Sequence, residues 1–328
     1  MNARPRVLCA GILVADLVIP PLPALPEPGE LAASDDFLLA PGGCAANVAI
    51  SLAKLGVTSA VAGCVGADAF GDFLQRELRG LGVDVRGLRE SADRGTSKTV
   101  ILPVAGEDRR FVHSFGANAE FTPDDIDRSV LAGCDIFYLG GYLVLPAMSA
   151  PALAHLCAEA RAAGARTVLD VVVPRGAAVS LESMREVLPF VDFFVPNEDE
   201  ARALTGEADP HRQAARLVEA GSGTAIVTRG TAGAVLRSRD ELLEVPAPAV
   251  ASIDQSGAGD AFSAGLIAGV LAGWDAARSL RFASVVGASA TTALGCTAGV
   301  FSRAQAETFT AARMPEVRRL ENAPHSVI

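Results

Sequence analysis

The sequence predicts a doubly wound α/β fold, with a mostly parallel sheet flanked by helices and a small β-sheet lid beside it. Short apolar runs alternate with helical patterns along the chain, as in successive strand–helix units. Several of these runs are apolar throughout, which is expected when both faces of a strand are covered. Two stretches break the alternation, and they predict the lid.

The expected strands and helices follow one another in chain order. The expected strands are the apolar runs at 7–14, 59–64, 135–139, 167–173, 191–195 and 224–227. The expected helices, in which apolar residues recur at helical spacing, are 45–55, 70–80, 150–163, 198–204 and 210–220. From 258 to 292 the pattern is helical.

The lid is expected from two segments outside the strand–helix units. Residues 17–40 are rich in proline and end in an extended-looking stretch at 31–39, and residues 96–115 resemble a hairpin with its turn at 105–108. The predicted lid comprises 15–40 and 96–117, and the predicted large domain comprises 1–14, 41–95 and 118–328. Ordinary surface loops are the alternative interpretation of both lid segments.

Composition excludes several classes of function. The 328 residues carry 28 Lys and Arg against 38 Asp and Glu, a formal net charge of −10. Nucleic acids and anionic membranes need a basic surface, so neither is an expected partner, whereas backbone amides can still hold a small phosphorylated molecule. The six cysteines and four histidines are scattered. We therefore expect reduced thiols in a cytoplasmic protein and no zinc site.

Two segments superficially resemble membrane signals. Arg4 and Arg6 precede the apolar run 7–15, and residues 282–302 carry no charge. The first run is followed by Asp16 and several prolines, so a buried strand is expected instead of a signal peptide. The second is diluted by Ser, Thr and Gly, so a core helix that ends in a loop is expected instead of a membrane span.

The sharpest motif is a heptapeptide before a helical run at 261–271: Asp254-Gln255-Ser256-Gly257-Ala258-Gly259-Asp260. Gly257 and Gly259 allow backbone N–H groups to turn inward at a helix start, where the helix dipole also favours an anion. It is neither a Walker A loop nor a dinucleotide fingerprint. A carboxylate at Asp260 suits the removal of a proton from a hydroxyl that attacks a phosphate. A simple helix N-terminus is the alternative.

These residues closely resemble the late signature of the PfkB (ribokinase-like) carbohydrate kinases. Other segments resemble that family in the same order: Pro41-Gly42-Gly43-Cys44-Ala45-Ala46-Asn47, Val65-Gly66 with Asp68 and Phe70-Gly71, Gly116-Ala117-Asn118-Ala119, Pro196-Asn197-Glu198-Asp199-Glu200-Ala201, and Thr228-Arg229-Gly230-Thr231 with Gly233. The resemblance covers nearly the whole chain and implies the ribokinase-like fold.

The resemblance also implies roles for individual residues. It implies that Asp260 is the catalytic base and that Gly257, Ala258 and Gly259 form the anion hole. ATP is expected at Asn197, Thr228, Gly230, Thr231, Gly233, Gly257 and Gly259. Mg²⁺ is expected near Asn197 and Glu200, mostly through its waters. A helix N-cap with a capping-box partner is the alternative interpretation, and the two are compatible. The acceptor is expected at Asp16, Gly42, Gly43, Asn47 and Asp260, and a K⁺ site at Asp254 and Ser256.

Three departures from ribokinases affect the expected acceptor. Val14, Cys44 and the segment 141–142 stand where ribokinases have Asn, Lys and Glu beside the sugar. The loss of three polar contacts argues against ribose itself, because recognition of buried hydroxyls depends on placed hydrogen bonds. Arg110 and His113 on the lid hairpin are candidate replacement contacts, with a solvated face as the alternative. Gln255 is unusual and has no assigned role.

The sequence therefore predicts an ATP- and Mg²⁺-dependent kinase that phosphorylates a primary hydroxyl of a sugar while the lid excludes water. A nucleoside kinase of the same fold is the main alternative, because Val14, Cys44 and Tyr142 suggest an apolar pocket for a base. A catalytically silent sugar or nucleotide sensor is a second alternative, and a dinucleotide-dependent oxidoreductase lacks its glycine fingerprint. A homodimer through the lid is expected from the resemblance alone.

Overall fold

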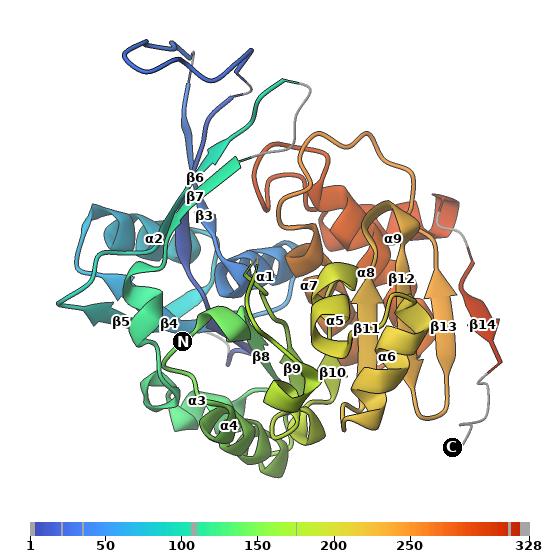
Figure 1. Ribbon diagram of the computed structural model, residues 1–328. Helices are drawn as coiled ribbons and strands as arrows, with labels where there is room; N and C mark the ends of the chain where they lie inside the picture. The colour runs from blue at the N-terminus through green and yellow to red at the C-terminus, as the bar shows by residue number, and fades with distance from the viewer. Residues whose placement is uncertain are drawn as a thin grey trace.

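The computed structural model describes residues 4–20, 22–34, 36–105, 110–174, 176–313 and 316–321, and within them a ten-stranded sheet forms the large body (Figure 1). The sheet order is β14-β13-β12-β11-β10-β9-β8-β1-β4-β5. The strands are β1 (Val7–Gly11), β4 (Ser59–Gly66), β5 (Asp84–Ser91), β8 (Ile136–Gly140), β9 (Arg166–Leu169), β10 (Phe193–Phe194), β11 (Thr224–Thr228), β12 (Ala234–Ser238), β13 (Leu242–Val245) and β14 (Arg318–Leu320). From β5 to β11 the strands are parallel, and β12 to β14 continue the sheet antiparallel.

Helices cover both faces of this sheet. On one face lie α1 (Cys44–Lys54), α2 (Ala69–Gly80), α7 (Ala258–Leu271), α8 (Ala276–Ala290) and α9 (Arg303–Arg313). On the other lie α3 (Arg128–Gly133), α4 (Ala150–Ala162), α5 (Glu198–Thr205) and α6 (Pro210–Glu219). Alternate residues of one strand serve the two cores, since Val7 and Cys9 pack in the first and Leu8 and Ala10 in the second. The predicted doubly wound α/β class is confirmed.

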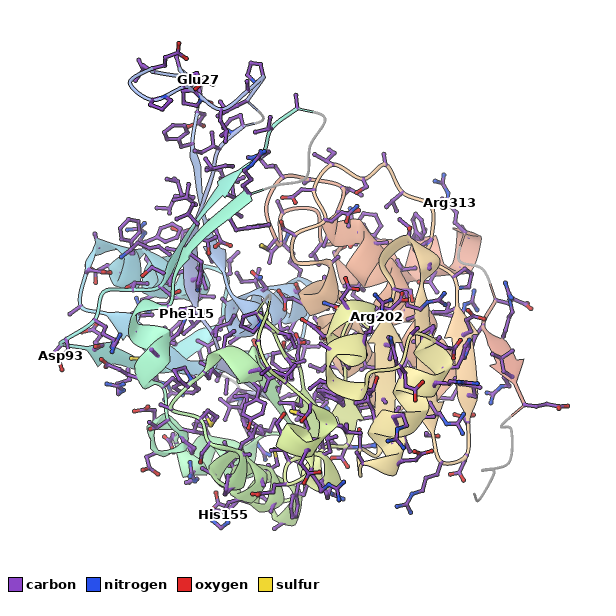
Figure 2. All side chains as sticks on the ribbon, viewed as in Figure 1. Glu27, Asp93, Phe115, His155, Arg202 and Arg313 are labelled. Carbon is purple, nitrogen blue, oxygen red and sulfur yellow. The ribbon has the colours of Figure 1, made fainter. Side chains whose placement is uncertain are left out.

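A second, four-stranded sheet stands away from the body (Figure 1). Its order is β3-β2-β6-β7, and its strands are β2 (Val14–Val18), β3 (Leu38–Gly42), β6 (Lys98–Leu102) and β7 (Arg110–Ser114). Glu27 lies at the far tip of this projection, and Phe115 lies where β7 returns to the body (Figure 2). The small sheet is the predicted lid sheet, and the exact division of the chain into lid and body stays a prediction.

The predicted strand at 7–14 is wrong in its second half. β1 ends at Gly11, and Val14 already begins β2 of the lid. Gly11 has a φ of 132°, and a Cβ there would overlap the backbone of Gly140. The chain therefore turns between the two sheets at a residue that needs no side chain.

Other element bounds also differ from the predictions. The extended stretch expected at 31–39 is a strand only from Leu38, the runs at 167–173 and 191–195 shorten to β9 and β10, and the single helical stretch from 258 divides into α7 and α8. Gly273, at φ 70°, and Asp275, which caps α8, separate these two helices. Residues 106–108 of the predicted lid turn at 105–108, and residue 109 of the following arm, lie outside the described residues. None of the helices that the structure describes is long and apolar enough to span a membrane.

Candidate active site

The site forms where the carboxyl ends of β1, β8 and β9 approach the N-terminal ends of α1 and α7. In doubly wound sheets this edge is the usual place for ligands, because strand ends and helix N-termini converge there. The contact is direct between the two helices, since Asn47 of α1 bonds Asp260 of α7. The lid strand β2 brings Asp16 to the same place. The Oδ2 atom of Asp16 lies 3.7 Å from the Cys296 thiol.

The glycine motif that was expected to bind an anion forms the start of α7. Gly257 is the N-cap at a φ of 73°. As a glycine it has no side chain that could cap the first N–H groups of the helix. A Cβ on Gly257 would overlap the carbonyl oxygen of Cys296, whereas one on Gly259 would meet no atom within 4 Å. The space beside Gly259, in the first turn of α7, is therefore open.

Asp254 holds this turn against the neighbouring loop. Its two carboxylate oxygens accept backbone N–H groups from Ser256 and Gly295, each at 2.9 Å. The side chain is 6% exposed. Both oxygens are thus already engaged with the backbone, and Gln255 beside them is exposed.

Asp260 lies in the first turn of α7 and is half-buried. Its Oδ2 accepts a hydrogen bond from Asn47 Nδ2 at 2.8 Å. Burial raises the pKa of Asp260, and hydrogen bonds from Asn47 and Cys44 oppose that rise because they favour the charged form. The result is a carboxylate that is more basic than usual and fixed in direction.

Asp16 is a buried carboxylate on β2, paired across the lid sheet with Ala40 and Thr99. Burial raises its pKa to about 6, with hydrogen bonds from Thr99 and Cys296 opposing the rise and the charges of Asp260 and Asp254 adding to it. A Cβ on Gly42 would overlap this carboxylate. Glycine at 42 therefore permits the close approach of β3 to Asp16.

Gly43 makes the turn from the lid into α1. It is the N-cap of that helix at φ 87°, and a Cβ there would lie 2.5 Å from the carbonyl oxygen of Ile12. Four residues further on, Asn47 is 3% exposed and directs its amide at Asp260. The structure thus brings Asp16, Gly42, Gly43, Asn47 and Asp260 to one place.

Asn197 and Glu200 form a reciprocal capping box at the start of α5. Asn197 Oδ1 accepts from the Glu200 N–H at 2.9 Å, and Glu200 Oε2 accepts from the Asn197 N–H at 2.8 Å. Burial raises the pKa of Glu200 to about 7, and the charge of Asp260 adds to the rise. The pair lines a cavity of about 400 Å³ with Val173, Pro174, Gly176, Ala177, Asp199 and Ala203.

The expected ATP turn follows β11 and adjoins this cavity. Thr228 forms an isolated bridge with Asn197, and Gly230 and Thr231 are exposed at the turn. Gly233 has a φ of 90°, and a Cβ there would overlap the carbonyl oxygen of Val245. These residues lie beside α5, whereas Asp16 and Gly42 belong to the lid side of the site.

The lid candidates Arg110 and His113 are both exposed on β7. His113 Nδ1 lies 2.9 Å from Thr99 Oγ1, and Thr99 pairs with Asp16 across the sheet. His113 is therefore linked to the acceptor side through one residue. Its part in binding stays a prediction.

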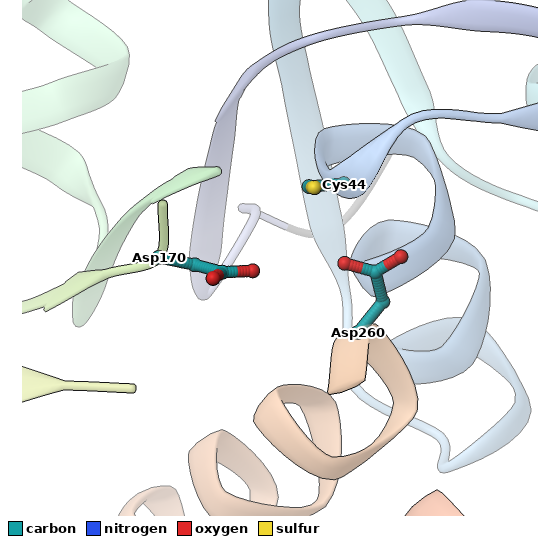
Figure 3. Close-up of side chains that lie close together, drawn as sticks. All are labelled: Cys44, Asp170 and Asp260. Atoms are coloured by element: carbon teal, nitrogen blue, oxygen red, sulfur yellow. The ribbon is translucent and has the colours of Figure 1, made fainter. Parts of the chain in front are cut away.

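Sequence reasoning missed Asp170, which lies directly after β9. It is 9% exposed and accepts a hydrogen bond from Tyr138 Oη at 3.2 Å. Burial raises its pKa well above the usual value, and the charges of Glu200 and Asp260 raise it further. Asp170, Cys44 and Asp260 point toward a common space (Figure 3). A lone carboxylate within the apolar run 167–173 was the available signal.

Comparisons with known proteins agree with this geometry. The family model described as pfkB family carbohydrate kinase matches residues 4–302. The chain is 32% identical over 245 residues to deoxyribokinase from Salmonella typhi, covering 73% of this chain and 77% of that protein. It is 29% identical over 308 residues to aminoimidazole riboside kinase from Salmonella typhimurium, covering 90% and 92%. With fructokinase from Escherichia coli the identity is 30% over 294 residues, covering 82% and 85%.

A solved structure shares the whole architecture. A putative ribokinase II from E. coli, in complex with ATP and Mg²⁺, superposes with a TM-score of 0.79 at 25% identity, covering 94% of this chain and 99% of that one. Ribokinase from Arabidopsis thaliana, complexed with ribose and ATP, superposes with a TM-score of 0.80 at 23% identity over 94% and 99% of the chains. At that identity the second likeness concerns the fold alone.

Proposed function

This chain belongs to the pfkB family of carbohydrate kinases, and we propose that it transfers the γ-phosphoryl group of ATP to a primary hydroxyl of a sugar, with Asp260 as general base. One observation carries the assignment of the base. The Asp260 carboxylate, fixed by Asn47 at 2.8 Å, lies in the first turn of the helix that the glycine motif begins. A proton acceptor and anion-stabilising amides thus share one helix end.

The reaction needs little from Asp260 beyond position and basicity. The carboxylate takes the proton of the acceptor hydroxyl. The hydroxyl oxygen forms a bond to the γ-phosphorus while the bond between the γ-phosphorus and the bridging oxygen of the β-phosphate breaks. The Gly257, Ala258 and Gly259 amides stabilise the charge of the transferred group. Burial favours this chemistry, because it raises the pKa of Asp260 above that of an exposed aspartate.

The acceptor is proposed to lie between Asp260 and Asp16. Asp16 accepts hydrogen bonds from sugar hydroxyls, while the missing side chain at Gly42 lets β3 lie directly against the Asp16 carboxylate. Since Asp16 belongs to the lid sheet, movement of the lid would bring this contact to the acceptor and exclude water in one step.

Asn197 and Glu200 are proposed to hold Mg²⁺ with Asp199 nearby. Their donors are oxygens on the wall of one cavity, which suits a hard cation bound partly through its waters. When bound, Mg²⁺ neutralises charge on the ATP phosphates. The proposed K⁺ contacts fit less well, because both oxygens of Asp254 already accept backbone N–H groups. No step is assigned to K⁺.

A riboside is the second candidate acceptor, and the likeness to aminoimidazole riboside kinase favours it. Tyr142 does not support it, because this side chain is 6% exposed and packs within the core beneath the sheet. A panel of sugars and nucleosides, scored for ADP release with Mg²⁺ and with or without K⁺, separates the two. ADP release with nucleosides and none with free sugars would overturn the sugar assignment.

We also propose a homodimer formed through the lid. Apolar side chains lie open to solvent on this projection: Leu31 is 93%, Phe37 53% and Val112 62% exposed. Covering them against a second lid would remove apolar surface from water. Light scattering of the purified protein tests this, and a mass equal to one chain at micromolar concentration would overturn it.

A further inference from the structure

Three side chains with metal-binding atoms meet on the acceptor side of the site. Cys44 from the start of α1, Asp170 after β9 and Asp260 in α7 each offer one ligand atom, and these atoms all lie within 4.8 Å of one another. Figure 3 shows the three side chains directed at one space from three elements. The scattered positions of the cysteines do not indicate this cluster, because only the fold brings these residues together.

The ligand types select a class of metal. A thiolate with two carboxylates suits Zn²⁺, which accepts sulfur and oxygen ligands in a tetrahedral arrangement. Mg²⁺ binds oxygen and does not favour a thiolate. Three protein ligands leave one position for water, as in open zinc sites.

Asn47 gives an independent indication that a ligand binds at this cluster. It lies one helical turn after Cys44, is 3% exposed, and donates its amide hydrogen to Asp260. Its Oδ1 is buried and has no hydrogen-bond partner among the described residues. A buried acceptor without a partner is costly, and a cation or a water on that cation would satisfy it.

The electrostatics of the cluster also favour a cation. Two acidic side chains, Asp170 and Asp260, share one space with the Cys44 thiol. In the described part of the chain, no lysine or arginine bonds either of these two carboxylates. A divalent ion would stabilise all three deprotonated groups at once.

We propose that Cys44, Asp170 and Asp260 bind one Zn²⁺ ion per chain, and that Zn²⁺ inhibits the kinase by occupying the carboxylate of Asp260. The Cys44 sulfur gives up its proton to solvent as the Zn–S bond forms, and each carboxylate donates an oxygen electron pair after losing any proton it carries. The binding stands on its own geometry, whereas the inhibition rests on the proposed function.

Binding is tested on the full chain, without ATP, by titration with Co²⁺ and then Zn²⁺. Co²⁺ should produce one equivalent of a sulfur-to-metal charge-transfer absorption, which Zn²⁺ abolishes by displacement. Cys44→Ser should remove the absorption and weaken Zn²⁺ binding by at least about 100-fold, since loss of a ligand exceeds loss of a supporting contact. Cys157→Ala is the matched control, because this buried thiol packs in α4 within the core on the other face of the sheet.

Asp170→Asn keeps the side-chain volume and should also weaken Zn²⁺ binding. It tests the same site if the Cys44 variant does not fold. Equal Zn²⁺ affinity in wild type and Cys44→Ser would overturn the site and assign the ion to surface groups such as His155 on α4 (Figure 2). If Zn²⁺ binds as expected but no sugar or nucleoside is phosphorylated, the metal site stands and the proposed function fails. If the kinase is active and the Co²⁺ absorption is absent, the proposed function stands and the metal site fails.

Discussion

Asn47 donates a hydrogen bond from Nδ2 to Asp260 Oδ2 across 2.8 Å, although 213 positions separate the two residues in the chain. The bond joins the N-terminal turns of α1 and α7, which begin at the two glycine motifs of the sequence. It also favours the charged form of Asp260 and so opposes the effect of burial, which raises the pKa of this side chain. A contact between distant segments thus contributes to both the position and the protonation of the proposed base.

Asp260→Asn is expected to lower kcat by at least about 100-fold, because an amide cannot take the proton of the acceptor hydroxyl. ATP affinity should change little, since the backbone amides of the glycine turn remain. Coupled ADP assays give kcat, and calorimetry gives the ATP dissociation constant. Asp240→Asn, at an exposed position, is the control. Turnover near the wild-type rate would remove Asp260 from the role of base.

Asn47→Leu should shift the acidic limb of the kcat/KM profile to higher pH. The variant retains side-chain volume and removes the donor that favours the charged carboxylate, so the pKa of Asp260 rises and the base is protonated at higher pH. Ser51→Ala is the control on the same helix, because the buried Ser51 hydroxyl has no partner among the described residues. An unchanged acidic limb would show that this hydrogen bond does not control the base.

The fold class and the glycine turn were accessible from sequence because their signals are local. Strand–helix alternation fixes a doubly wound sheet, and two glycines before a helical run indicate an open helix start. The antiparallel strands β12 to β14 were not predicted, since β12 and β13 follow each other with no helix between them and do not produce that alternation. The end of β1 was also missed, because Gly11 turns the chain within a continuous apolar run.

Asp170 and Cys44 were not predicted as partners for a different reason. Asp170 appears as one acid in an apolar run, and Cys44 as an unusual residue after two glycines. Their proximity depends on the register that places β9 beside β8 and on the packing of α1 over β1 and β8. Pairwise contacts of this kind are set by the sheet as a whole, and no short segment contains them.

Gly42→Ala should raise the KM for the acceptor far more than the KM for ATP. The added methyl group would overlap the Asp16 carboxylate, so either that side chain or β3 must move. Gly80→Ala is the control, because a Cβ at the end of α2 meets no atom within 4 Å. Steady-state kinetics with each substrate varied in turn provides the measurement. Equal changes in both KM values would contradict a local effect on the acceptor side.

Gly257→Ala should reduce kcat and destabilise the start of α7. A left-handed φ of 73° costs an alanine about 1 kcal/mol or more, and the new methyl group would also overlap the Cys296 carbonyl oxygen. Gly56→Ala has the same φ of 73° and no atom within 4 Å, so it isolates the backbone cost from the overlap. Equal kcat in the two variants would show that the contact with Cys296 is unimportant for catalysis.

Asp16→Asn should stabilise the fold at neutral and alkaline pH while it weakens acceptor binding. Burial raises the pKa of Asp16 from 3.8 to about 6, so the folded state binds the proton more tightly than the unfolded state. Stability is therefore lost as pH rises through this window, and the loss above it amounts to at most about 3 kcal/mol. Urea unfolding of both proteins at about pH 8 and about pH 4 tests this. The free energy of unfolding of Asp16→Asn should exceed that of the wild type at the higher pH, and the difference should disappear at the lower pH. A difference present only at the lower pH would show that the folded protein stabilises the charged form of Asp16.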